Sequence, residues 1–169
     1  MSRQCVVQRE TIWEAAMPDV VARLRAGGRV AELGAHVGQS SIDLAREFPR
    51  VRVDAVGEDQ ASIEAASGEA GRAGVSERVV FHVAPLEEAP LVGPYDLVFA
   101  FDGRDDIAHS LRALRRMRQL AMPGGTVLVA AGEQDDVLVD AVYARAAGFS
   151  KVDILPAHDP ARRVFRLTP

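Results

Sequence analysis

The sequence contains almost no cysteine, few aromatic residues and no long uncharged stretch. Cys5 is the only cysteine among 169 residues, so an intramolecular disulfide is impossible, and no cysteine–histidine set has the spacing of a zinc site. The longest run without charge, residues 119–132, is interrupted by proline and glycine and is too short to cross a bilayer. The N-terminus shows no secretory signal pattern. We therefore expect a soluble, cytoplasmic protein with no membrane partner.

The charge balance is also informative. Lys151 is the only lysine, so nearly all basic residues are arginine, and the net charge is −4. A negative chain is poorly suited to bind phosphate backbones, and we expect no nucleic-acid partner. Arg112, Arg115, Arg116 and Arg118 lie beside apolar residues at helical spacing and are expected to form a solvated helix face.

Apolar runs and helical patterns alternate along most of the chain, which favours a doubly wound α/β sheet in one domain. Several strands are almost wholly apolar, as is typical of parallel strands covered on both faces. The expected helices after the first strand are residues 40–47, 60–73, 107–120 and 136–147. The expected strands are residues 30–33, 51–56, 79–83, 96–101, 126–131, 151–155 and 163–167.

The two ends of the chain depart from this alternation. Residues 11–14 match a capping box, and Asp19 is expected to cap a second helix that stops at Gly27 and Gly28. Residues 1–28 are thus predicted to form an N-terminal helical cap on an α/β domain of residues 29–169. The last two strands have no helix between them, which predicts a closing antiparallel hairpin and seven strands in all.

One short segment carries the strongest functional signal. Glu32 closes an apolar strand, Gly34 and Gly38 follow two and six positions later, and a helix begins after them. Such a turn brings bare backbone N–H groups and a helix N-terminus close to a ligand. A carboxylate at the end of a buried strand needs donors or a ligand to compensate its burial. The pattern predicts a nucleotide-type cofactor site.

This segment lies on the acid-x-Gly-x-Gly-x-Gly motif of the class I methyltransferases, which use S-adenosylmethionine (SAM), and the chain resembles that family from about residue 20 onward. Tyr95-Asp-Leu-Val resembles the family's fourth-strand signature. Met122-Pro-Gly-Gly resembles its turn into the fifth strand, and Ala147-Gly-Phe its entry to the sixth. The resemblance extends to a bacterial small-molecule branch. It implies a Rossmann-like seven-stranded sheet.

The resemblance also assigns roles to residues at the carboxyl ends of the first four strands. The glycines would let the backbone approach the methionine part of SAM, the end of the second strand would meet the ribose, and the end of the third the adenine. The implied cofactor-binding residues are Glu32, Gly34, Ala35, His36, Gly38, Gly57, Glu58, Asp59, Ala84, Pro85, Phe101 and Asp102.

Three positions depart from the family pattern. His36 stands where the middle glycine usually lies. Gly57 occupies the place of the acid that accepts the ribose hydroxyls, with Glu58 and Asp59 directly after it. Ala84 and Pro85 replace the aspartate expected near the adenine. These substitutions predict weakened SAM contacts unless Glu58 takes over the ribose.

Candidate catalytic residues follow the fourth strand and the glycine turn. Asp102 and Asp105 could orient or deprotonate an acceptor, and His36 has an unperturbed pKa suited to a general base. Asp106 is a natural N-cap for the helix expected from residue 107. Asp102 also resembles the aspartate of the metal-dependent branch, but residues 130–132 offer no side-chain oxygen ligand and Glu133 is the nearest acid, so no metal is expected.

Two classes of function remain open at this point. The leading hypothesis is SAM-dependent methyl transfer to an oxygen or nitrogen of a small metabolite. The alternative is a methyltransferase-fold protein that does not methylate, either a cyclase or isomerase or a non-catalytic partner subunit. Little chain precedes the first strand, which leaves little material for a lid. A homodimer or a partner subunit could therefore close the cleft.

Overall fold

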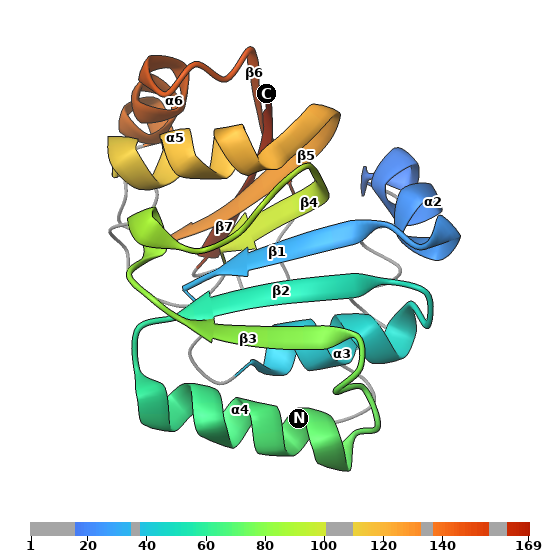
Figure 1. The fold of residues 1–169 in the computed structure, drawn as a ribbon. Coiled ribbons are helices and arrows are strands. Elements are labelled where there is room, and N and C mark those ends of the chain that lie inside the picture. Colours follow the sequence, from blue (N-terminus) through green and yellow to red (C-terminus); the bar gives the residue numbers. More distant parts are fainter. Residues whose placement is uncertain (1–15, 35–37, 101–109, 133–136, 156–161) are drawn as a thin grey trace.

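The computed structural model of the chain describes residues 16–34, 38–100, 110–132, 137–155 and 162–169. These residues form one seven-stranded sheet in the order β3-β2-β1-β4-β5-β7-β6 (Figure 1). The sheet is parallel from β3 to β5, whereas β7 runs antiparallel to both β5 and β6. The expected α/β sheet with a closing antiparallel hairpin is therefore confirmed. The strands are β1 (Arg29–Leu33), β2 (Arg52–Gly57), β3 (Val79–Val83), β4 (Tyr95–Ala100), β5 (Ala121–Gly132), β6 (Lys151–Leu155) and β7 (Arg162–Thr168).

Helices cover both faces of the sheet (Figure 1). Helices α2 (Pro18–Ala26), α3 (Gln39–Glu47) and α4 (Gln60–Arg72) lie on one face, and α5 (Leu111–Leu120) and α6 (Val137–Ala146) lie on the other. Each face has its own buried apolar cluster. One joins α2 and α3 to β1, β2 and β4, and the other joins α5 to β4, β5 and β7. No helix in the described part of the chain has the length and apolarity needed to cross a membrane.

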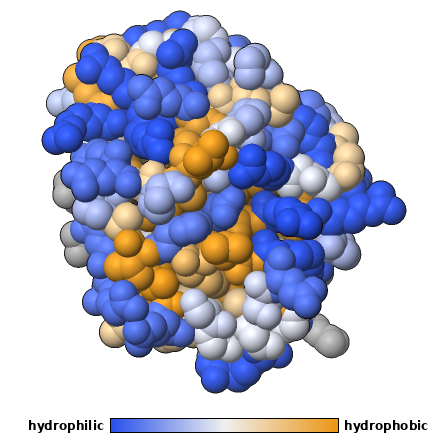
Figure 2. All heavy atoms as spheres, viewed as in Figure 1, coloured by the Kyte–Doolittle hydropathy of each residue, from blue (hydrophilic) through white to orange (hydrophobic). Residues whose placement is uncertain are grey.

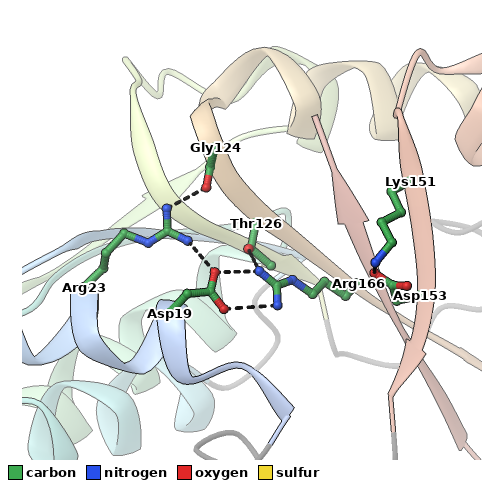
Figure 3. A network of polar contacts seen from close by, with 7 residues as sticks. All are labelled: Asp19, Arg23, Gly124, Thr126, Lys151, Asp153 and Arg166. Carbon is green, nitrogen blue, oxygen red and sulfur yellow. Dashed lines mark hydrogen bonds and ion pairs between the residues drawn. The ribbon is translucent and has the colours of Figure 1, made fainter.

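Helix α2 is packed into the core of the sheet. Its residues Val20, Val21 and Leu24 are buried in the same cluster as β1. The prediction that Asp19 caps this helix is wrong, because the helix begins at Pro18, whose fixed φ suits the first turn. Asp19 lies in that turn, and its carboxylate binds Arg23 and Arg166 (Figure 3). Most of the helix expected around residues 11–17 lies outside the described residues.

Helix α5 begins later than expected. Ser110 has an extended backbone and its hydroxyl oxygen accepts a hydrogen bond from the N–H of Ala113 at 3.2 Å, which makes it the N-cap. A continuous helix from residue 107 is therefore wrong, since an extended Ser110 interrupts it. The proposed cap Asp106 lies outside the described residues.

Strand β5 is longer than expected, because it begins at Ala121 rather than at Thr126. Its pairing with β4 shifts register between Tyr95 and Leu97, where β5 has extra residues. Gly124, at φ +76°, provides the left-handed backbone that this irregularity uses. Read from the sequence, the proline and glycines here indicated a turn before the strand, whereas the structure includes them in its bulged start.

The link between β3 and β4 contains the short helix η1 (Leu86–Glu88) and crosses the face that α5 and α6 cover (Figure 1). The guanidinium of Arg116 in α5 holds this link by donating hydrogen bonds to the carbonyl oxygens of Ala89 and Leu91, at 2.9 and 3.0 Å. Apolar patches lie between hydrophilic ones on this side of the molecule (Figure 2), and Val80 of β3 is 47% exposed.

Candidate cofactor site

The candidate site lies at one edge of the sheet, where the parallel strands β1 to β4 end. The strand order reverses between β1 and β4, so the connections from these neighbours leave toward opposite faces. In open α/β sheets ligands bind in the crevice outside the strand ends at such a switch point. Gly34 follows β1 here, Gly57 ends β2, Ala84 follows β3 and Ala100 ends β4.

The acid of the glycine motif is held by a buried hydrogen bond. Glu32 is 1% exposed, and the hydroxyl of Ser41 donates to its Oε2. Ser41 lies in the first turn of α3 and is fully buried. A donor for this carboxylate was expected from the sequence, but Ser41 was not identified. The signal that could have found it is a serine at the start of the helix that the glycine turn introduces.

The two outer glycines of the motif both have left-handed backbones. Gly34 has φ +78° and Gly38 has φ +64°, a region that other residues rarely adopt. Gly38 precedes α3 and is tightly packed, because a Cβ built there would lie 2.5 Å from the Phe81 ring and 2.8 Å from the Ala66 Cβ. The glycine at this position therefore also allows close packing of α3 on β3 and α4. Its contact with a cofactor stays a prediction.

The two acids that follow β2, Glu58 and Asp59, have different surroundings. Asp59 caps α4, since its carboxylate accepts the N–H of Ser62 at 2.7 Å. Glu58 is exposed beside the buried Gly57. At the neighbouring end of β3, the N–H of Ala84 donates to the Gly57 carbonyl at 3.0 Å, which joins the two strand ends. Pro85 follows and is exposed.

Ala35, His36, Phe101, Asp102 and Asp105 lie outside the described residues. Within the described ranges, no three histidine, cysteine, aspartate or glutamate side chains gather where they could hold a metal ion.

A second polar cluster, which sequence reasoning missed, lies across the first four strands. Asp54 of β2 accepts the hydroxyl of Tyr95 at 2.9 Å, lies 3.6 Å from the guanidinium of Arg29, and lies 3.4 Å from Nε2 of His82. The Arg29 guanidinium also stacks over the Tyr95 ring. Burial of the phenol, with the carboxylate of Asp54 beside it, raises the pKa of Tyr95 to about 12. Arg29 and Tyr95 begin their strands, so this cluster lies away from the cofactor edge.

Comparison with known proteins agrees with this geometry. Residues 30–125 match the family described as "Methyltransferase domain". The chain is 29% identical over 103 residues to the 27-O-demethylrifamycin SV methyltransferase of Amycolatopsis mediterranei (strain S699), which covers 60% of this chain and 38% of that protein.

Two of the solved structures that share this fold are a methyltransferase and a cyclase. The S-adenosylmethionine-dependent methyltransferase SibL in its apo form has a TM-score of 0.71 at 22% identity, covering 92% of this chain and 55% of that one. The [4+2]-cyclase SpnF has a TM-score of 0.68 at 20% identity, covering 83% of this chain and 60% of that one. This chain thus spans about a third to three fifths of the length of these proteins.

The matched residues cover more than half of the chain and include the glycine turn, the ends of β2 and β3, and all of β4. The chain therefore belongs to the class I SAM-dependent methyltransferase family, whose cofactor is S-adenosylmethionine.

Proposed function

We propose that this chain transfers a methyl group from S-adenosylmethionine to an oxygen or nitrogen atom of a small metabolite. The observation that carries the proposal is the position of the matched glycine turn, Glu32 to Gly38, at the switch point of the sheet. The one curated relative described above is itself named a methyltransferase of a small molecule.

The described residues at this edge fit the cofactor. The left-handed backbone at Gly34 turns the chain so that main-chain groups can approach a ligand. The first turn of α3 contains no acidic residue and has no side-chain cap, so its N–H groups are available for the carboxylate of the methionine part. Glu32, fixed by Ser41, would orient the turn or the amino group, and Glu58 would accept the ribose hydroxyls.

S-adenosylmethionine supplies a methyl group on a positively charged sulfur, which is open to in-line displacement. The residues of the chain have the tasks of orienting the acceptor, excluding water and managing the acceptor proton. Asp102, Asp105 and His36 are the candidates for holding or removing that proton. Ala84 and Pro85 would line the adenine side.

Titration calorimetry with S-adenosylmethionine and S-adenosylhomocysteine tests the proposal. We expect both to bind, and Glu58→Gln to weaken binding about tenfold or more, because charged hydrogen bonds to the ribose are lost. Asp59→Asn is the matched control, since asparagine also caps helices and the carboxylate at 59 is occupied by α4. Absence of binding to the wild-type chain would refute methyl transfer.

A second candidate function is a non-methylating role, such as ring closure in a shaped pocket. Two observations favour it: Gly57 replaces the usual ribose acid, and one similar fold is the cyclase SpnF. Gly57→Asp separates the two candidates. A large gain in SAM affinity from near zero would indicate a decayed site and favour the second candidate. If the wild-type chain binds SAM measurably and Gly57→Asp changes that affinity little, Glu58 already binds the ribose.

A further inference from the structure

We propose that the outer face of α5 is a docking surface for an acidic protein partner. The surface consists of Arg112, Arg115 and Arg118, called here the α5 arginine row. Docking itself does not depend on the reaction, but the role of the partner in delivering the acceptor rests on the proposed function.

The three arginines share one face of the helix. They recur every third residue and span about 9 Å along the helix axis. All three are exposed, whereas Ala113, Leu114, Met117 and Leu120 of the same helix are buried against the sheet. Hydrophilic patches lie on this side of the molecule, with apolar patches between them (Figure 2). The Arg118 guanidinium lies over Gly148, which follows α6.

Among the side chains that the structure describes, none forms an ion pair with the row. Helix α5 contains four arginines and no acidic residue. Glu87 and Glu88 lie in η1, which contacts α5, yet no ion pair joins either to the row in the described part of the chain. Like charges three and four positions apart destabilise a helix. A partner that supplies carboxylates would remove this repulsion.

The chemistry of the row favours a protein carboxylate surface over a nucleic acid. Guanidinium groups bind carboxylates with two parallel hydrogen bonds, and carboxylates three or four residues apart on an acidic helix match the spacing of the row. The whole chain has a net charge of −4, which would repel an extended polyanion beyond the short row. Because the row consists of arginines alone, binding to it should depend on charge and should be transient and sensitive to salt.

The α5 arginine row lies on a helix whose first turn is near the cofactor edge, so a partner bound to it would lie close to the site. Helix α5 is the first described helix after β4, and β4 ends at the cofactor edge. Helix α5 begins on the side of the sheet at which β1, β2 and β3 end (Figure 1), so Arg112, in its first turn, is the member of the row at the end of the helix nearest that edge. A partner bound along α5 would therefore place an acceptor that it carries beside the site.

The test uses the whole chain and a defined acidic probe. The probe is a fluorescein-labelled helical peptide of three Glu-Ala-Ala-Glu-Ala-Ala-Ala heptads, about 21 residues long. Fluorescence anisotropy should show binding at low salt that weakens at about 0.15 M salt. The triple variant Arg112→Glu, Arg115→Glu, Arg118→Glu should bind about tenfold or more weakly, the size expected when three exposed ion pairs become repulsions. Arg46→Glu, Arg50→Glu, Arg52→Glu makes the same charge change on exposed arginines elsewhere and should stay within about twofold.

Three outcomes would overturn the proposal: no peptide binding by the wild-type chain, equal weakening in the two triple variants, or tighter binding of duplex DNA or phosphatidylserine vesicles than of the peptide. Calorimetry with S-adenosylmethionine on the α5 triple variant keeps the two proposals separate. Unchanged cofactor affinity with lost peptide binding assigns the loss to docking. Absent cofactor binding in every variant would refute the proposed function and leave the docking result standing.

Discussion

The guanidinium of Arg166 in β7 binds both carboxylate oxygens of Asp19 in α2, at 3.2 and 2.7 Å, across 147 positions of sequence (Figure 3). Arg166 also donates to the hydroxyl of Thr126, and Arg23 joins Asp19 to the carbonyl of Gly124 at 2.6 Å. The first described helix is thereby fixed to β5 and β7 near the end of the chain. Bidentate pairs of this kind impose geometry as well as attraction.

Asp19→Asn should lower the free energy of unfolding by about 1 kcal/mol, because the carboxylate is half exposed and its pairs are partly screened. Burial opposes ionisation of Asp19, but the hydrogen bond and charge of Arg166, with a smaller effect of Arg23, hold its pKa below the usual value. This stabilisation is present above the unfolded pKa, about 3.9, and is lost as pH falls below it. Urea unfolding at neutral and acid pH measures both effects.

Asp153→Asn is the control for this prediction. Asp153 pairs with Lys151 at 2.8 Å within the same strand, β6, so its loss leaves the long-range connections intact. We expect the stability of this variant to remain close to that of wild type. If Asp19→Asn and Asp153→Asn have equal effects, the bidentate contact has no special role in holding α2.

Gly38→Ala should destabilise the fold by about 2 kcal/mol or more. The new methyl group would meet the Phe81 ring at 2.5 Å, and alanine is strained at φ +64°. Gly124→Ala is the matched control, because Gly124 has a similar φ of +76° but open space around it. Thermal unfolding of the two variants separates crowding from backbone strain. Equal losses would contradict a packing role for Gly38.

The fold was largely predictable because local patterns and global topology agree along most of the chain. The apolar strands and the lack of a helical sequence pattern between the last two predicted strands indicated the observed sheet, and the glycines after residue 26 indicated the end of α2. Contacts between distant residues were not predictable. The Asp54 cluster, for example, needs four strands in register. The local capping rule failed at Asp19, because the helix begins at Pro18, and α5 begins after Ser110 rather than at residue 107.

Ser41→Ala should weaken SAM binding about tenfold, because it removes the hydroxyl that orients the buried Glu32 carboxylate. The prediction rests on the proposed function. Ser41→Thr keeps a hydroxyl and should recover most of the affinity, whereas a merely structural role would make the larger threonine no better than alanine. Calorimetry gives the affinities, and urea unfolding shows how much of each change is stability alone.

Tyr95 should ionise well above the range of an ordinary tyrosine. Burial and the neighbouring Asp54 carboxylate raise its pKa to about 12, although Arg29 and Arg116 oppose the shift. Because the folded pKa exceeds the unfolded value of about 10, the protonated phenol stabilises the fold below pH 10, and this contribution is lost as pH rises toward 12. The tyrosinate absorbance of the wild-type chain should therefore show a late phase that Tyr95→Phe removes.

Asp54→Asn should move this phase to lower pH, since it removes the negative charge beside the phenol while the amide can still accept its hydrogen bond. A late phase that persists in Tyr95→Phe, or that Asp54→Asn leaves unchanged, would show that the Asp54–Tyr95 contact does not control the titration.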